Sequence, residues 1–150
     1  MLDNVSILVS FGRDELKHVH QLRYEILRKP LGLPASSAIF AGDEFESTIH
    51  ILAKSSGLLI GCATIVPDEQ EKRVQLRGMA VDLDKQGIGI GKRILDAAKA
   101  IAKQRDQLLW CNARFSAIGF YEHQGMHQSG PVFEIPGIGK HVVMKYLSSE

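Results

Sequence analysis

The sequence predicts a mixed α/β domain in which an antiparallel meander is followed by a β-α-β crossover. Three strand-like runs separated by short turns occupy residues 47–81. A glycine-rich turn, a long amphipathic segment and a short apolar run at 107–113 come next. Strands joined by tight turns pair antiparallel, whereas a strand, a helix and a second strand in succession form a parallel pair. We therefore expect both kinds of pairing in one sheet, which is mixed rather than doubly wound.

The bulk properties are those of one globular domain that spans residues 1–150. A chain of this length buries roughly 70% of the surface that it exposes when unfolded. The net charge is +1 with scattered Lys and Arg, and no apolar run approaches the ~20 residues of a membrane helix. We therefore expect neither a nucleic-acid nor a membrane partner. The first residues lack the basic and apolar regions of a signal peptide, so a cytoplasmic protein with reduced Cys62 and Cys111 is expected.

The N-terminal part is predicted to form a strand, a helix and an irregular segment. Residues 4–11 alternate as a strand does, and residues 12–27 carry apolar side chains at helical spacing. The helix is expected to end at Pro30, because proline lacks an N–H donor and restricts the residue before it. Residues 31–47 are read as irregular or short-helical, and they end in the acidic sequence GDEFE.

The meander is predicted from three apolar, β-branched runs. Residues 47–55 and 58–66 flank Ser56-Gly57, a pair that is typical of a hairpin turn. Residues 73–81 form the third strand.

The C-terminal half is expected to add two helices and three strands. Apolar positions after the glycine turn trace one helix face up to about Arg105, and residues 107–113 are apolar enough for a strand buried on both faces. A short helix at 116–124 is closed by Gly125, a frequent C-terminal cap. The last two strands are expected at 126–130 and 140–147, with 131–139 as the connection between them.

The glycine turn, Gly87, Gly89 and Gly91 in the sequence KQGIGIGKRIL, is the strongest functional motif. Glycine allows a sharp turn and lets backbone N–H groups face an anion, and the helix that follows adds the positive end of its dipole. A nucleoside-triphosphate loop would need glycine and a hydroxyl where the chain has Gln86 and Arg93. The turn therefore predicts a phosphate site of another class.

Two further phosphate-binding templates were compared with this turn, and only one of them matches it. The dinucleotide fingerprint needs a glycine where the chain has Lys92, and three strands already precede the turn. A template of Gln or Arg followed by Gly-x-Gly-x-Gly or Ala matches residues 86–91 at every position. Taken alone, the motif is also compatible with a flexible surface turn.

Two blocks together resemble the Gcn5-related N-acetyltransferase (GNAT) superfamily, and within it a branch of small bacterial enzymes. They are LRGMAVDLDKQGIGIGKRIL (76–95) and NARFSAIGFYEHQGM (112–126). The resemblance implies a mostly antiparallel sheet of about six to seven strands flanked by about four helices. It also implies that the parallel strands at 73–81 and 107–112 splay apart to admit coenzyme A.

The resemblance implies acetyl-CoA as co-substrate and no metal. The backbone of residues 79–81 would hold the pantetheine arm as an added strand does, residues 87–92 the pyrophosphate, and Asn112 the pantetheine amides. The cofactor-binding residues implied are Met79, Ala80, Val81, Gln86, Gly87, Ile88, Gly89, Ile90, Gly91, Lys92, Asn112 and Tyr121.

Two residues are expected to serve catalysis. The resemblance places Tyr121 near the cofactor sulfur, where a phenol can protonate the departing thiolate. Many family members carry a Glu on the strand before the glycine loop, but residues 73–79 contain no carboxylate. Glu44 is our candidate for contact with a cationic substrate, and a solvated loop explains it equally well. The candidates for the general base are Asp43, Glu44, Glu46, His50 and Asp82.

Other conspicuous residues are given simpler explanations. Arg114 stands where many family members have Asn, so the contact of Asn112 differs in this branch. Tyr24 and Arg28 are candidates for an acceptor pocket, although surface or packing roles fit them as well. The six histidines show no metal-ligand spacing, and Cys111 is read as a buried strand thiol rather than a nucleophile.

These observations predict an N-acetyltransferase that moves the acetyl group of acetyl-CoA to a primary amine of a small molecule or peptide. The amine would attack directly within a ternary complex. Two alternatives stay open: a CoA-binding module of the same fold with little or no catalysis, and an acyltransferase for a longer acyl-CoA. A homodimer formed through the C-terminal strand is compatible with the sequence, which does not require one.

Overall fold

The structure is a computed structural model that describes residues 4–147. The strands are β1 (Val5–Phe11), β2 (Ile49–Ser55), β3 (Leu58–Asp68), β4 (Arg73–Val81), β5 (Leu108–Arg114), β6 (His127–Ile135) and β7 (Gly139–Tyr146). The α-helices are α1 (Leu16–Arg23), α2 (Ile90–Arg105) and α3 (Ile118–His123). Short π- or 3-10-helical turns cover Tyr24–Arg28, Lys29–Leu31, Ala35–Ala38, Leu83–Lys85 and Phe115–Ala117. Within the described residues this is one α-helix fewer than the resemblance implied.

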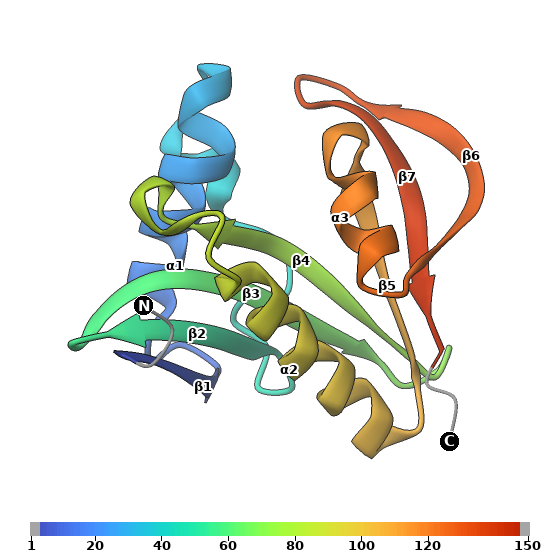
Figure 1. Ribbon diagram of the computed structural model, residues 1–150, viewed down its shortest axis with the longest axis horizontal. Coiled ribbons are helices and arrows are strands. Elements are labelled where there is room, and N and C mark those ends of the chain that lie inside the picture. The colour runs from blue at the N-terminus through green and yellow to red at the C-terminus, as the bar shows by residue number, and fades with distance from the viewer. Residues whose placement is uncertain (1–3, 148–150) are drawn as a thin grey trace.

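The seven strands form one sheet in the order β1-β2-β3-β4-β5-β7-β6 (Figure 1). All neighbouring strands are antiparallel except β4 and β5, which are parallel. These two are parallel because α2 carries the chain from the end of β4 back to the start of β5. The predicted mixed, mostly antiparallel sheet is confirmed.

β6 extends beyond its predicted bounds. Residues 131–139 were expected to be a connection, but β6 continues into them as far as Ile135. Pro131 lies where the register between β6 and β7 shifts, between Ser129 and Phe133. Proline donates no hydrogen bond, and an irregular position in a strand at the edge of the sheet tolerates that loss.

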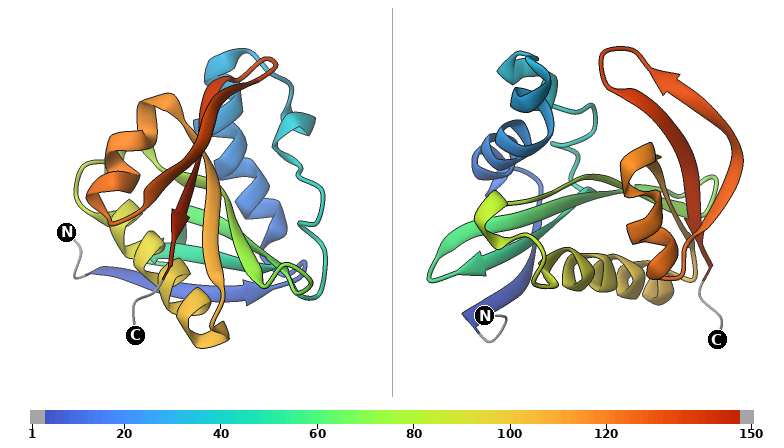
Figure 2. Two further views of the ribbon diagram at one scale, coloured as in Figure 1. Left: turned by 90° about the vertical axis from the view of Figure 1, so that its right-hand side faces the viewer. Right: turned by 45° about the horizontal axis from the view of Figure 1, so that its top comes forward.

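α1 and α2 lie on opposite faces of the sheet (Figure 2). Because successive strand residues point to opposite faces, Ile51 and Ala53 of β2 join the core under α2, whereas Leu52 joins the core under α1. The core under α2 also contains Tyr121 of α3. No helix within residues 4–147 is long and apolar enough to cross a membrane.

β4 and β5 pair along only part of their length. The register joins Arg73–Leu76 to Leu108–Cys111 and goes no further. Figure 1 shows the two strands diverging toward their C-terminal ends. Residues 77–81 of β4 therefore have no strand partner on the side of β5, as the resemblance implied for a splayed pair.

A β-bulge in β4 lies where the strands diverge. The register with β3 shifts between Cys62 and Thr64, so that one residue of β3 faces two of β4. Gly78 in this bulge has a φ of 58°, which glycine adopts without a steric penalty. A Cβ at Gly78 would lie 2.6 Å from Arg23 Nε and 3.0 Å from Phe40 Cε2. The bulge therefore requires glycine for both its backbone angle and its packing.

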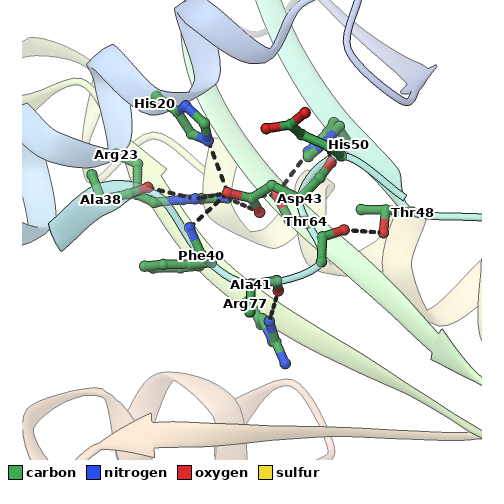
Figure 3. A network of polar contacts seen from close by, with 12 residues as sticks. His20, Arg23, Ala38, Phe40, Ala41, Asp43, Thr48, His50, Thr64 and Arg77 are labelled. Atoms are coloured by element: carbon green, nitrogen blue, oxygen red, sulfur yellow. Dashed lines mark hydrogen bonds and ion pairs between the residues drawn. The ribbon is translucent and has the colours of Figure 1, made fainter. Parts of the chain in front are cut away.

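The Arg23 side chain at the end of α1 is 0% exposed and is paired with Asp43 (Figure 3). Nη1 donates to Asp43 Oδ2 at 2.8 Å, and Nη2 donates to Oδ1 at 3.2 Å. Nη1 also donates to the Ala38 carbonyl at 2.7 Å, and Nη2 to Thr64 Oγ1 at 2.9 Å. The guanidinium lies over the Phe40 ring, 3.9 Å from its centroid.

Asp43 accepts two further hydrogen bonds, from the Phe40 N–H and from His20 Nε2, each at 2.8 Å. Burial alone would raise the pKa of Asp43, but the hydrogen bonds and charge of Arg23 outweigh it and lower the pKa overall. The carboxylate stays ionised. The ion pair therefore fastens the segment before β2 to α1 and β3.

Gly78→Ala is expected to lower the free energy of unfolding by about 2 kcal/mol or more, because it combines a left-handed φ with overlap against Arg23. Gly119→Ala is the matched control, since a Cβ there has no neighbour within 4 Å. Gly119 lies within α3, so alanine should be neutral or slightly stabilising. Urea denaturation measures both variants, and equal midpoints would contradict this account of the bulge.

Asp43→Asn is expected to lower the free energy of unfolding by about 3 kcal/mol, because it leaves the Arg23 guanidinium buried without a countercharge. The control is the adjacent acid: Glu44 forms an exposed ion pair with Arg13. Glu44→Gln should change stability by less than about 0.5 kcal/mol. Equal stability of the two variants in chemical denaturation would show that the buried pair is dispensable.

Candidate active site

A cavity of about 570 Å³ lies between the diverging strands β4 and β5. β4 lines it with residues 75–79, and β5 with Cys111, Asn112 and Arg114. The remaining walls come from α3, the β6–β7 hairpin and the segments that follow α1. The cavity therefore occupies the space opened by the splayed pair.

The glycine turn lies between the end of β4 and the N-terminus of α2, a helix of 16 residues. Gly87 and Gly89 have φ angles of 82° and 96°, which keep the turn tight. Within the described chain, no backbone N–H of residues 87–92 donates to a backbone or side-chain acceptor. These groups and the positive end of the α2 dipole are therefore available to an anion.

Two side chains flank this turn. Gln86 Nε2 donates to the Val81 carbonyl at 2.9 Å and so ties the turn to the end of β4. Lys92 Nζ lies 2.9 Å from Asp96 Oδ2, one helical turn further along α2. The pyrophosphate role of residues 87–92 stays a prediction, with which this geometry is compatible.

The residues expected at the pantetheine arm border the splayed strands. Met79, Ala80 and Val81 lie in the part of β4 that β5 does not pair. Asn112 follows Cys111, the last residue of β5 that pairs with β4, and its side chain is exposed. Met79 and Asn112 line the cavity, whereas Ala80 packs in the core under α1.

Tyr121 and Cys111 meet at the cavity wall. Both residues line the cavity, and both belong to the core under α2. Burial raises the pKa of Cys111 to about 12, so the thiol is a poor nucleophile at neutral pH. Burial and the neighbouring Cys111 raise the pKa of Tyr121 well above its usual value, so the phenol keeps its proton. The role of Tyr121 as a proton donor to the cofactor thiolate stays a prediction, with which a protonated phenol in the cavity wall is compatible.

The five base candidates named from the sequence all lie outside the cavity lining. Asp43 is committed to Arg23. His50 Nε2 donates to the Asp43 carbonyl at 3.0 Å, and His50 Nδ1 accepts from Thr64 Oγ1 at 2.9 Å. Burial lowers the pKa of His50, which keeps the ring neutral. Both nitrogens are therefore occupied in packing.

The exposed acids Glu44 and Asp82 interact with groups outside the cavity. Glu44 Oε1 lies 3.3 Å from Arg13 Nη2 at the surface. Asp82 accepts a hydrogen bond from the backbone N–H of Asp84 and caps the short turn after β4. The role expected for Glu44 stays a prediction that its surface position does not support.

His141 of β7 lines the cavity and was missed by the sequence reasoning. Its Nδ1 lies 2.7 Å from the Gly139 carbonyl, which can only accept, so Nδ1 carries the proton. Nε2 of the neutral ring then holds a free lone pair. His141 is the register partner of Arg114 across β5 and β7. Correct pairing of the last strand with 107–113 is the signal that could have found it.

Three arginines also line the cavity: Arg28, Arg77 and Arg114. Arg28 was a candidate for an acceptor pocket and Arg114 was noted as a departure from the family, but Arg77 was overlooked. Tyr24, the other candidate, is not among the lining residues. Burial lowers the pKa of each of the three arginines.

Neither cysteine forms a disulfide, and both are buried. Within residues 4–147, no three His, Cys, Asp or Glu side chains are grouped so that they could hold a metal ion.

Comparison with known proteins agrees with this geometry. Residues 14–126 match the Acetyltransferase (GNAT) family. The uncharacterised N-acetyltransferase YitI of Bacillus subtilis is 30% identical over 135 residues, which are 86% of this chain and 89% of YitI.

Solved structures share the fold. The crystal structure of Escherichia coli ElaA superposes with a TM-score of 0.82 at 18% identity, over 94% of this chain and 98% of ElaA. A GNAT acetyltransferase from Elizabethkingia anophelis with acetyl-CoA bound has a TM-score of 0.65 at 18% identity, over 97% and 99% of the two chains. Because the family match spans most of the chain and YitI is similar along nearly its whole length, the chain belongs to the GNAT acetyltransferase family.

Proposed function

We propose that this protein transfers the acetyl group of acetyl-CoA to a primary amine, which attacks the thioester directly within a ternary complex. One observation carries the proposal: the cavity joins the unpaired edge of β4 to Tyr121, whose raised pKa keeps the phenol protonated. The related Elizabethkingia protein binds acetyl-CoA. Family membership supports acetyl transfer in general, and the residue roles below are specific to this chain.

The donor site would be built mainly from backbone. Residues 79–81 have no strand partner on the side of β5, where the pantetheine arm can add as a strand does. The N–H groups of residues 87–92 would bind the pyrophosphate. Asn112 lies on the opposite side of the gap and would bind the amides of the arm.

The transfer requires an ammonium nitrogen to lose two protons in all and the leaving sulfur to gain one. The amine attacks the thioester carbonyl, whose developing oxyanion a backbone N–H of β4 can stabilise. As the tetrahedral intermediate collapses, the carbon–sulfur bond breaks and the thiolate takes a proton from Tyr121, while the surplus proton on the nitrogen leaves and restores the phenol. The attacking amine needs a free lone pair, and His141, which lines the cavity, would accept its proton at Nε2 directly or through water.

Two alternatives predict different results. A CoA-binding module would bind acetyl-CoA but release no thiol above background when amines are added. An acyltransferase for longer chains would prefer longer acyl-CoA molecules when they compete with acetyl-CoA. Thiol release from acetyl-CoA with a panel of primary amines, followed by acyl-chain competition, separates the three functions.

Glu44 keeps its sequence-based prediction as a contact for a cationic acceptor. A higher KM for the amine in Glu44→Gln, with an unchanged Kd for CoA, would support that role. An unchanged KM would assign Glu44 to the surface alone.

Tyr121→Phe is expected to lower kcat by about 100-fold, because a general acid contributes on the order of 10²–10⁴ to a rate. The Kd for CoA should change little. Tyr146→Phe is the control, since Tyr146 packs against Lys99 and is not among the residues that line the cavity. Steady-state kinetics and calorimetric CoA binding test both variants. Wild-type turnover in Tyr121→Phe, with chemistry shown to be rate-limiting, would exclude the acid role.

His141→Gln is expected to lower kcat about 100-fold near neutral pH. The deficit should shrink as pH approaches the pKa of the amine, near ~10.4 for a lysine side chain, because free amine then forms without a base. His127→Gln, on the exposed edge strand β6, is the control. A rate deficit that stays constant with pH would indicate a structural role for His141 instead.

A further inference from the structure

The cavity has an excess of positive charge that the composition of the chain does not explain. The whole chain has a net charge of only +1. Arg28, Arg77 and Arg114 nevertheless all line this one cavity, and no Asp or Glu among the described residues lines it. The charge is therefore concentrated where a substrate would bind.

Two of the guanidiniums converge on one atom. Arg114 Nη2 donates to the Leu27 carbonyl at 2.7 Å, and Arg28 Nη1 donates to the same oxygen at 3.3 Å. The two charged groups are therefore held side by side, although they come from β5 and from the turn after α1. Burial, and then the charge of Arg114, lower the pKa of Arg28. Arginine stays protonated in spite of such shifts, so the repulsion between them persists.

All hydrogen-bond acceptors of these arginines in the described chain are neutral. Arg28 Nε donates to the Ser37 carbonyl at 3.2 Å. Arg77 donates to the Gln75 side chain at 3.0 Å and to the Ala41 carbonyl at 2.6 Å. Among residues 4–147, no carboxylate lies within ion-pair distance of the three cavity arginines. The nearby Arg23, by contrast, has its countercharge in Asp43.

Several N–H groups of the pair are still available for a ligand. Arg114 Nε and Nη1, and Arg28 Nη2, have no hydrogen-bond partner among the described residues. A guanidinium binds planar or tetrahedral oxyanions with two parallel hydrogen bonds. A half-buried pair of like charges with free donors is therefore a preformed oxyanion site.

We propose that Arg28 and Arg114 form an oxyanion subsite for the acceptor, so that the substrate is an amine that also carries a carboxylate or a phosphate group. This inference rests on the proposed acetyl transfer and narrows its substrate class. Arg77, on the β4 wall, adds to the positive potential of the same cavity. Polycationic amines are disfavoured by this potential, because the cavity would bring like charges together.

Position on the sheet separates this subsite from Tyr121. Cys111 and Asn112 are consecutive in β5, so their side chains point to opposite faces. Cys111 lies with Tyr121 in the core under α2. Arg114 shares the face of Asn112 and binds the turn after α1, on the other side of the sheet. Arg114 would thus bind the oxyanion on the α1 face, whereas Tyr121 would approach the thioester from the α2 face.

The test uses acceptors that differ by the oxyanion alone. Lysine is compared with 1,5-diaminopentane, its decarboxylated form, and glucosamine 6-phosphate with glucosamine. We expect kcat/KM to be at least about 10-fold higher for the oxyanion member of one pair. The pair that shows the preference distinguishes a carboxylate from a phosphate. If 1,5-diaminopentane and glucosamine both have a kcat/KM equal to or higher than that of their oxyanion counterparts, the proposal is overturned.

Arg28→Gln and Arg114→Gln are expected to raise KM for the preferred acceptor about 10- to 100-fold and to abolish the preference within the pair. Their Kd for CoA should match that of the wild type. Lys29→Gln is the matched control, because it removes the same charge one residue from Arg28, from a side chain that is 61% exposed. If the arginine variants weaken CoA binding instead, the arginines serve the donor and the proposal is wrong.

Binding provides a readout that does not depend on catalysis. The melting temperature of the CoA-saturated protein is measured with each of the four amines. A rise with an oxyanion member, absent with its partner and lost in Arg114→Gln, would support the subsite even if no amine were acetylated. Binding without acetylation of any amine would overturn only the proposed transfer. No rise with either oxyanion amine, together with no preference in kinetics, would overturn the subsite.

Discussion

The buried ion pair between Arg23 and Asp43 is the contact on which the architecture around the cavity depends. It joins the end of α1, the segment before β2 and the Thr64 side chain of β3. Its guanidinium also fills the space beside Gly78, where no side chain would fit. The bulge in β4 and the ion pair are thus packed against each other. A buried pair of this kind adds little net stability over an apolar substitute, but the loss of one partner is costly, so the pair mainly specifies the arrangement.

That arrangement makes the parallel pair incomplete. β4 bends at its bulge and leaves β5 after four paired residues on each strand. A cavity opens in the middle of the sheet rather than at its edge, with one group of side chains on each face. The Tyr121–Cys111 contact belongs to the α2 face, whereas Arg114 and His141 lie together across β5 and β7. A donor and an acceptor can therefore meet through the sheet from opposite sides.

Acidic and basic side chains are also separated, the acids outside the cavity and the arginines along its wall. The acidic side chains between residues 43 and 46 are buried against Arg23 or exposed outside the cavity, and the arginines that line the cavity keep neutral partners. The acidic segment had suggested a cationic substrate, because an isolated run of carboxylates is attractive to amines. None of these carboxylates lines the cavity: the segment before β2 contributes Ile39, Phe40 and Ala41 to its wall, while the Asp43 carboxylate faces Arg23.

The sequence by itself determined the features that depend on neighbours along the chain. Alternation and helical spacing located the strands and helices, Ser56-Gly57 located a hairpin, and the glycine turn located the N-terminus of α2. The resemblance added the splayed pair. Only the tertiary structure decided which distant side chains meet. Arg23 and Asp43 are 20 residues apart, and Arg114 reaches the Leu27 carbonyl across 87 residues. Such contacts depend on register and helix packing, which periodicity does not encode, and so the charge of the cavity and the position of His141 emerged only from the fold.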